Sequence, residues 1–265
     1  MNDISNPYQA PEANLVAETS GGDWTLAEPR RVPVSHGWKW IADAFRLFAR
    51  SPGIWIVNLL IFWVLAMVAS VLPLVGMLAT IPIVIMTGGL MRGAYELDRG
   101  ESGLKIDHLF VGFRDRLGRL AAIGGLYLLA TIVIMFAVMI PLFAGIGFIA
   151  ASTPALDEYA VFTPMIIAVA VMFVLFIPVT MAYWFAPALA MMHEDADAIR
   201  AMKLSLVGCL RNILPLIVYG VIMTLLLVLA SIPLFLGLLV MGPVMVASMY
   251  TGYRDIFVTA ADDEG

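Results

Sequence analysis

Residues 140–145 read Ile-Pro-Leu-Phe-Ala-Gly, and residues 232–237 read Ile-Pro-Leu-Phe-Leu-Gly. A shortened copy, Leu-Pro-Leu-Val-Gly, occupies residues 72–76. Each copy lies inside a long apolar stretch, where the proline removes one backbone donor and the glycine relaxes the backbone. That combination is typical of a tight bend between two membrane-spanning helices, because backbone groups inside a membrane must be paired within the protein. Three bends predict three helical hairpins and therefore six spans.

The composition indicates a membrane protein. Of 265 residues, 62% are hydrophobic and 13% are charged, whereas soluble domains are roughly 25% charged. Four stretches contain no Asp, Glu, Lys or Arg: residues 51–91, 120–156, 159–192 and 212–253. A span needs about 20 apolar residues. The first and last stretches are therefore long enough for two spans each, and the middle two hold one each.

The bends and the charge-free stretches together place the six spans at about 53–72, 74–91, 120–140, 162–190, 213–232 and 234–253. A shorter helical pattern precedes each hairpin, at about 38–50, 105–118 and 196–211. These segments are too short to cross a membrane and carry charge on one face, so we expect them to lie along its surface. In the first, the apolar face comprises Trp38, Ile41, Phe45 and Phe48, and the basic residues between them are Lys39, Arg46 and Arg50.

The predicted fold class is therefore all-α and integral to the membrane, with three repeats of a cytoplasmic amphipathic helix followed by a spanning hairpin. We divide the chain into a disordered cytoplasmic tail (1–33), a six-span membrane domain (34–256) and an acidic cytoplasmic tail (257–265). The second unit carries an insertion, and the sequence leaves open whether residues 144–156 form a re-entrant segment.

The basic residues predict the orientation. All fifteen Lys and Arg lie before the first span, between the second and third, between the fourth and fifth, or after the sixth. Cytoplasmic loops carry the excess of Lys and Arg in membrane proteins. We therefore expect a multi-pass protein of the bacterial inner (plasma) membrane with both termini in the cytoplasm.

Few residues suggest chemistry. Cys209 is the single cysteine, and His36, His108 and His193 lie at separate polar junctions without a second metal ligand at suitable spacing. None of the predicted spans contains an acidic, basic or histidine side chain of the kind that ion-coupled transport or membrane catalysis needs. We predict no catalytic residue, cofactor or metal site. Asn58 is the polar side chain that would mark a solute path, although such residues more often bond neighbouring helices.

The sequence resembles a family of proteobacterial six-helix inner-membrane proteins that brings no assigned activity. The similarity rests on four stretches: Asn6-Pro7-Tyr8; Arg31-Val32-Pro33-Val34 with Gly37-Trp38-Lys39-Trp40-Ile41, Phe45-Arg46-Leu47-Phe48 and Pro52; Phe185-Ala186-Pro187-Ala188-Leu189; and Ala201-Met202-Lys203-Leu204-Ser205 with Cys209-Leu210-Arg211-Asn212. A looser similarity extends to YciC-like proteins and to the membrane domain of some glycerophosphodiester phosphodiesterases. The resemblance implies the fold and compartment above and no catalytic residues.

These observations favour a non-catalytic inner-membrane protein that holds lipid or a partner membrane protein through a cytoplasmic collar of amphipathic helices. The expected partners are membrane lipids, another membrane protein or a second copy of the chain, and not nucleic acid. The predicted contact residues are Trp38, Lys39, Phe45, Arg46, Arg50, Arg114, Arg116, Arg200 and Lys203. The alternative is a transporter or channel for a neutral or lipophilic solute that passes Asn58.

Overall fold

A computed structural model describes residues 25–71, 73–152 and 158–259. Within them the chain is almost entirely helical, and a two-residue antiparallel pair joins β1 (Thr25–Leu26) to β2 (Val258–Thr259). The helices are α1 His36–Arg50, α2 Pro52–Ser70, α3 Pro73–Leu78, α4 Thr80–Arg99, α5 His108–Asp115, α6 Leu117–Ser152, α7 Glu158–Trp184, α8 Ala186–Met192, α9 Ala198–Arg211, α10 Ile213–Ser231 and α11 Leu238–Phe257. The all-α class is thus confirmed.

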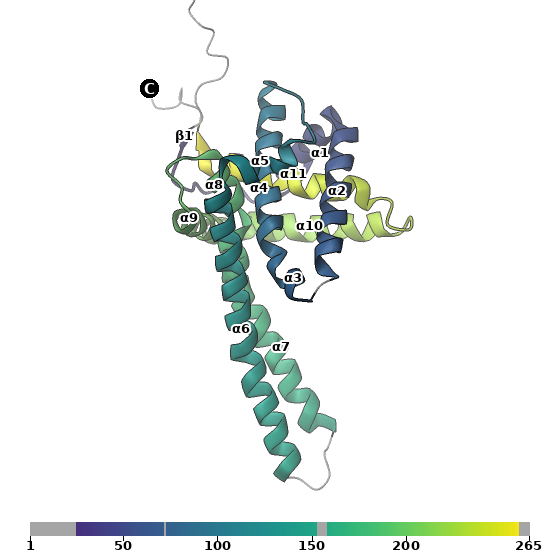
Figure 1. Cartoon of the computed structure of the whole chain (residues 1–265), viewed down its shortest axis with the longest axis vertical. Coiled ribbons are helices and arrows are strands. Elements are labelled where there is room, and N and C mark those ends of the chain that lie inside the picture. Colours follow the sequence, from purple (N-terminus) through teal and green to yellow (C-terminus); the bar gives the residue numbers. More distant parts are fainter. Residues whose placement is uncertain (1–24, 72, 153–157, 260–265) are drawn as a thin grey trace, which may run out of the picture.

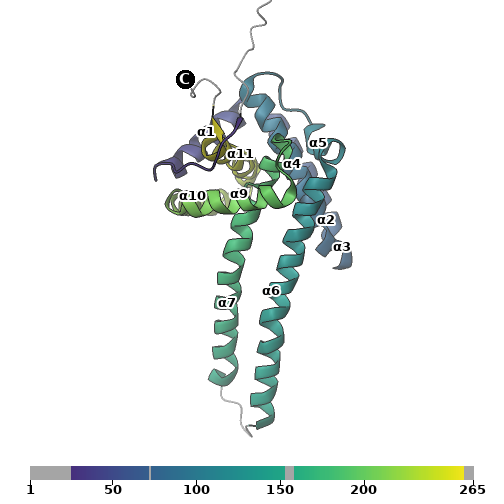
Figure 2. The same ribbon diagram turned by 90° about the vertical axis from the view of Figure 1, so that its left-hand side faces the viewer.

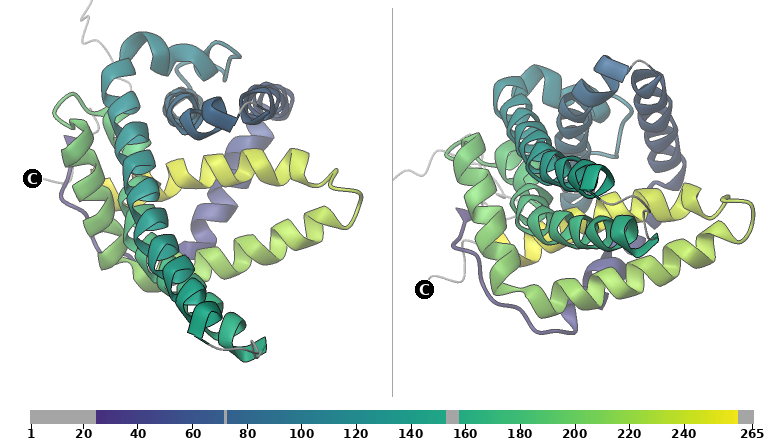
Figure 3. Two further views of the ribbon diagram at one scale, coloured as in Figure 1. Left: turned by 60° about the horizontal axis from the view of Figure 1, so that its bottom comes forward. Right: turned by 90° about the horizontal axis from the view of Figure 1, so that it is seen from below.

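The helices form two parts of different shape. The α6–α7 hairpin projects far beyond every other helix (Figure 1), and its distal half is flanked by no other element in either side view (Figure 2). The remaining helices, with the ends of α6 and α7 nearest to them, form what we call the body. Within the body, α10 and α11 run across the direction of α6 and α7 (Figure 3).

Five of the described helical segments are long and apolar enough to cross a membrane: Pro52–Ala69, Gly76–Arg99, Leu117–Ser152, Phe162–Met192 and Ile213–Ser231. The helix α11, the sixth predicted span, is not among them. Six spans and a threefold repeat are therefore not confirmed. The second hairpin is much longer than the others, and the third lies across it (Figure 1).

The predicted bend at Pro141 is wrong, because α6 continues through this residue to Ser152. A proline inside a helix removes one hydrogen bond and kinks the helix without having to end it. The segment 144–152 completes α6, and the chain reverses between Ser152 and Glu158, where residues 153–157 are outside the described part. The other two bends agree with the prediction, since Pro73 begins α3 and Pro233 lies between α10 and α11.

The core of the body surrounds α11. Its buried side chains include Tyr250, Tyr253 and Phe257, which lie against α1, α4 and α8. On α1 the buried side is formed by Trp40, Ile41, Ala44 and Leu47. Trp38, which belongs to the predicted apolar face, lies outside this buried side and is 51% exposed, so its predicted contact with lipid or a partner stays a prediction. Both the predicted apolar face and the observed buried side of α1 have a helical period of 3.6 residues. The small residue Ala44 lies on the side that packs more closely against the core.

Two adjacent residues at the end of α11 link distant parts of the chain. Arg254 pairs with Asp98 at the end of α4 and lies 3.7 Å from Asp43 of α1. Asp255 accepts hydrogen bonds from Trp40 Nε1 (2.8 Å) and from His36 Nδ1 (2.7 Å). Burial alone would raise the pKa of Asp255, but these hydrogen bonds outweigh it and lower the pKa. The carboxylate is therefore the form that holds α1 against α11.

The segment before α1 is ordered where the sequence predicted a disordered tail. The Ala27 and Arg30 amides donate to carbonyls of α11, and Asn212 both accepts from Val32 N and donates to Arg30 O. The prediction of disorder is wrong for residues 25–33, because backbone pairing and one asparagine side chain replace the apolar core that this segment lacks. The predicted disorder of residues 1–24 and most of the predicted acidic cytoplasmic tail, residues 260–265, concern parts outside the described residues. Within the predicted acidic tail, Val258–Thr259 form β2.

The role of Gly237 in the turn between α10 and α11 differs from the prediction that glycine relaxes the backbone there. Positive φ angles occur at Leu234 (53°) and Phe235 (64°), whereas Gly237 is in the right-handed helical region. A Cβ atom on Gly237 would lie 2.6 Å from both Cα and O of Ala230. The glycine therefore allows α11 to start in direct contact with the backbone of α10.

We expect Gly237→Leu to destabilise the protein more than Pro233→Ala. The leucine would overlap the Ala230 backbone, at a cost of about 1–3 kcal/mol, whereas the alanine only restores a donor in a turn. Thermal midpoints in mild detergent measure the difference. The matched control is Gly125→Leu, since a Cβ atom there meets nothing within 4 Å. Equal midpoints for Gly237→Leu and Gly125→Leu would contradict the proposed close contact.

We expect Asp255→Asn to lower the thermal midpoint at pH 7, because hydrogen bonds to a charged group contribute about 1.5–3 kcal/mol. The pKa of Asp255 is lowered in the folded state, so its contribution is present above the unfolded pKa and disappears as the pH falls through the folded pKa. The difference between wild type and variant should therefore shrink below about pH 4. The control Asp107→Asn removes an exposed partner of Arg114 and should have little effect. A difference that is unchanged at low pH would show that the charge of Asp255 is not responsible.

Candidate functional site

An apolar cavity lies in the corner where α10 turns away from α7. Its volume is about 430 Å³. The lining is apolar and aromatic, from Phe173, Phe176, Ile177, Thr180, Met181 and Trp184 of α7, Cys209 of α9, and Leu216, Tyr219 and Gly220 of α10. We call this space the corner cavity. It exists because α10 departs from α7 at a wide angle instead of packing along it (Figure 2).

A helix break fixes one wall of the corner cavity. At Phe185, α7 ends and α8 begins, which leaves backbone groups without helical partners. Ser205 of α9 satisfies both sides of this break, since its Oγ accepts from Phe185 N (2.9 Å) and donates to Met181 O (2.7 Å). The wall is therefore tied to α9 and does not depend on the contents of the cavity.

The polar groups at the corner cavity are few and uncharged. The Tyr219 hydroxyl is paired with Ser248 Oγ at 2.8 Å, and the Tyr219 ring meets Trp184 edge-on with centroids 6.0 Å apart. Burial raises the pKa of the Cys209 thiol to about 12, so this thiol stays protonated and unreactive at neutral pH. The corner cavity is suited to an apolar, uncharged occupant.

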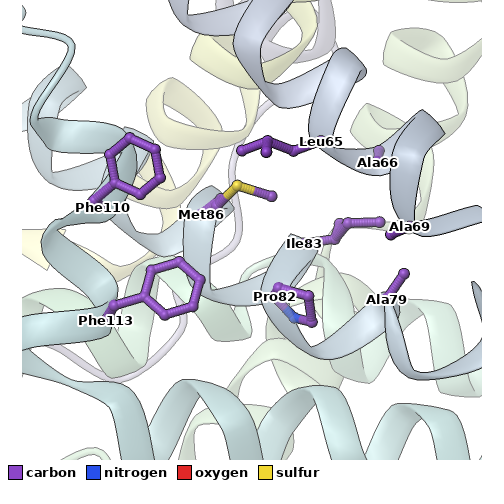
Figure 4. A pocket seen from close by; sticks show the side chains of 9 residues that line it. All are labelled: Leu65, Ala66, Ala69, Ala79, Pro82, Ile83, Met86, Phe110 and Phe113. Carbon is purple, nitrogen blue, oxygen red and sulfur yellow. The ribbon is translucent and has the colours of Figure 1, made fainter. Parts of the chain in front are cut away.

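A second apolar cavity of about 410 Å³ lies between α2, α4 and α5. Figure 4 shows the rings of Phe110 and Phe113 on one side, Leu65 on the other and Met86 between them. The rest of the lining comes from small or apolar side chains: Ala66, Ala69, Ala79, Pro82 and Ile83. This cavity resembles the first in chemistry, although none of its lining residues carries a hydroxyl or a thiol.

A basic hollow of about 250 Å³ lies on the face of α9 opposite Cys209. It is formed by Arg200, Lys203 and Arg211 together with Glu28 and Pro29 of the segment before α1. Arg211 donates to Pro29 O at 2.6 Å and therefore serves the fold. Arg200 and Lys203 are exposed, so their charges are available to an anionic group.

The predicted collar residues are distributed over α1, α5, α9 and their flanks. Lys39, Arg46 and Arg50 are exposed on α1 as expected, but Arg50 also donates to the Leu97 and Asp98 carbonyls of α4. Phe45 is partly buried against the core. Three of the arginines have acidic partners, since Arg46 pairs with Asp43, Arg114 with Asp107 and Arg116 with Glu194. The helices that carry these residues all belong to the body (Figure 1).

Asn58, the predicted mark of a solute path, is fully buried on α2. Its Nδ2 donates to Lys105 O at 3.2 Å, in the segment between α4 and α5, while its Oδ1 has no protein partner. Asn58 lines none of the cavities described above. Its observed contact ties α2 to the chain before α5.

The three histidines are held by different partners. His36 contacts Asp255, His108 contacts Glu96 at 3.1 Å, and His193 contacts the Tyr253 hydroxyl. Burial lowers the pKa of His193 below its ordinary value, which favours the neutral ring. Among residues 25–71, 73–152 and 158–259, no three His, Cys, Asp or Glu side chains lie close enough together to share a metal ion.

Sequence reasoning missed the corner cavity and the links made by Arg254 and Asp255. The pair of opposite charges at 254–255, directly after a long charge-free stretch, was an available signal for the links. No sequence signal was available for the corner cavity. Its lining residues have the pattern of ordinary apolar helix positions, and they come from three separate helices.

Comparison with known proteins supports the compartment. A Burkholderia thailandensis protein described as a probable inner membrane protein is 27% identical over 205 residues, which cover 72% of this chain and 73% of that protein. No family model and no solved structure matches the chain. The YciC-like and phosphodiesterase resemblances receive no support from these comparisons. The long apolar helices and this similarity together indicate a membrane-embedded, multi-pass helical protein that is similar to an inner membrane protein.

Proposed function

We propose that the protein holds membrane lipid without catalysing a reaction, and that an acyl chain occupies the corner cavity. The observation that carries the proposal is the apolar space of about 430 Å³ between α7, α9 and α10. Its size falls within the range of roughly 300–1,000 Å³ that is usual for ligand sites. In the proposal the body faces the cytoplasm, as the distribution of Lys and Arg predicts.

The lining favours an acyl chain over a polar solute. None of the residues that line the corner cavity is charged, and the Tyr219 hydroxyl is already paired with Ser248. A charged or strongly polar occupant would lose its hydration without gaining partners, which is costly. An acyl chain loses nothing of this kind, and the aromatic rings of Phe173, Phe176 and Trp184 give it large apolar contacts.

The exposed basic residues of α1 and α9 support an anionic lipid. Lys39 and Arg46 on α1 and Arg200 and Lys203 on α9 extend from the surface helices of the body. Each basic residue near an anionic leaflet contributes about 1 kcal/mol to membrane attraction. We propose that these residues attract anionic headgroups to the surface while the corner cavity selects for an apolar chain.

The transporter alternative has no specific observation in its favour. It required a polar path near Asn58, whose side chain instead bridges α2 and the segment before α5. A partner protein on the collar is also not needed to explain the corner cavity. We therefore assign the lipid-holding role first.

The variant Gly220→Leu tests the occupancy of the corner cavity. Gly220 lines the cavity, and a Cβ atom there meets nothing within 4 Å, so a leucine can fill the space without displacing a neighbour. We expect the variant to fold and to retain several-fold less phosphatidylglycerol in native mass spectrometry from mild detergent. The reason is competition for the same volume.

Gly125→Leu is the matched control for this experiment. It adds the same side chain to another helical glycine with open surroundings, on α6 and away from the corner cavity. It should retain lipid as the wild type does. Equal retention by the Gly220 variant, the Gly125 variant and the wild type would exclude the corner cavity as a lipid site.

The double variant Arg200→Gln and Lys203→Gln tests the role of charge. We expect it to lose the preference for phosphatidylglycerol over phosphatidylcholine while the total amount of bound lipid stays close to that of the wild type, because the corner cavity is intact. Gly220→Leu should instead lose both lipids in proportion. A double variant with an unchanged preference would show that these residues do not select headgroups.

A further inference from the structure

The orientation of α10 differs from that of a spanning helix. In Figures 1 and 2 it runs across α6 and α7, on the side of α11 toward which the α6–α7 hairpin projects. Its buried side, with Pro215, Tyr219 and Met223, packs toward α1 and α11. The opposite side is apolar and exposed over the whole length of the helix, at Ile213, Leu214, Ile217, Val221, Leu225, Val228 and Leu229.

The α6–α7 hairpin is long enough to cross a membrane with the part that extends beyond the body. A Cβ atom on Gly124 of α6 would lie 2.8 Å from Cα of Ile81, so Gly124 is level with the start of α4. From there α6 continues to Ser152 without a charged residue. At 1.5 Å per residue, residues 125–152 extend about 42 Å. The hydrocarbon core of a bilayer is about 30 Å thick.

The two turns also differ in composition. The α10–α11 turn is made of Ile232-Pro233-Leu234-Phe235-Leu236-Gly237, and Leu234 and Phe235 are 87% and 66% exposed. The sequence between α6 and α7 includes Thr153 and Asp157, and α7 begins at Glu158. A polar turn suits the aqueous side of a membrane, whereas an apolar turn is stable where acyl chains surround it.

We propose that α10 lies in the plane of the membrane, in the leaflet next to the body, and that the α6–α7 hairpin crosses to the other side. The occupant of the exposed α10 face is then the acyl chains of this one leaflet. The corner cavity borders α10 at Leu216, Tyr219 and Gly220, which lie outside this exposed face. Length and apolar composition alone do not distinguish an in-plane helix from a spanning one. The proposal does not depend on a lipid being held in the corner cavity.

Membrane depth along α10 tests this arrangement. Single cysteines replace Leu214 or Leu225 in a Cys209→Ser background, and both leucines are exposed. After spin labelling in phosphatidylglycerol and phosphatidylcholine vesicles, the depth of each label is measured by its accessibility to oxygen and to a water-soluble nickel complex. An in-plane α10 gives equal depths within a few ångströms. A spanning α10 would give depths that differ by about 16 Å, because eleven residues separate the two positions.

Leu129 and Ile140 of α6 form the matched control pair. They are also exposed and also eleven residues apart. Because α6 crosses the membrane in the proposal, this pair should differ in depth while the α10 pair does not. A depth difference along α10 as large as that along α6 would overturn the proposal.

Accessibility of the α10–α11 turn gives an independent result. Single cysteines at Leu236, Ser152 and Ser102 are treated with a membrane-impermeant maleimide on right-side-out and on inside-out vesicles. We expect Ser152→Cys and Ser102→Cys to react from opposite sides, and Leu236→Cys to react from the Ser102 side or from neither. Reaction of Leu236→Cys from the Ser152 side would show that α10 and α11 span the membrane.

Discussion

The structure depends on two charged residues at the end of its central helix. Arg254 and Asp255 are adjacent, and each is partly removed from water, which is costly unless partners are in place. Arg254 finds the Asp98 carboxylate, and this pairing raises the pKa of Arg254 against the opposing effect of burial. Asp255 accepts hydrogen bonds from Trp40 and His36. Three elements far apart in the sequence, α1, α4 and α11, are thereby fixed in one relative position.

The direction of α11 determines the rest of the body. The turn after α10 is short, and Gly237 lies against the Ala230 backbone, so α10 and α11 meet at this turn (Figure 3). Because α11 is held across the hairpin direction by its polar end, α10 also runs across it (Figure 3). This departure of α10 from α7 opens the corner cavity. The links made by Arg254 and Asp255 therefore affect the corner cavity by fixing the directions of α11 and α10, although neither residue lines the cavity.

Much of the helical layout could be predicted from the sequence, because charge-free stretches and helical periodicity are local signals. The helices α1, α9 and α10 begin and end within a few residues of their predicted limits. Errors arose where two local solutions were equally good. A proline in an apolar stretch is compatible with a bend between two helices or with a kink inside one helix. Pro141 lies inside α6. On α1, the helical period does not show that Trp40 is the buried tryptophan, because its partner Asp255 is more than 200 residues away.

The candidate site could not be predicted for a related reason. Exposed basic residues such as Lys203 are recognisable because charge is excluded from the membrane interior. A cavity, by contrast, is a property of the space between helices. Gly220 and Phe176 have no local feature that separates them from other apolar positions, and only the direction of α10 relative to α7 brings them to one space.

The distribution of polar and apolar groups within the body agrees with a single boundary between water and lipid. The links made by Arg254 and Asp255 involve α1 and α4, whereas the exposed apolar face of α10 is turned away from α1 and α11. The α6–α7 hairpin leaves the body on the α10 side (Figure 2). One plane can therefore place the links of Arg254 and Asp255 toward water. The exposed face of α10 and the α6–α7 hairpin then lie toward lipid. An upright α10–α11 pair would bring Leu234 and Phe235 to the far aqueous surface, where their exposed side chains would gain no apolar contact. The in-plane arrangement avoids this cost and leaves the corner cavity open to the acyl chains of the same leaflet.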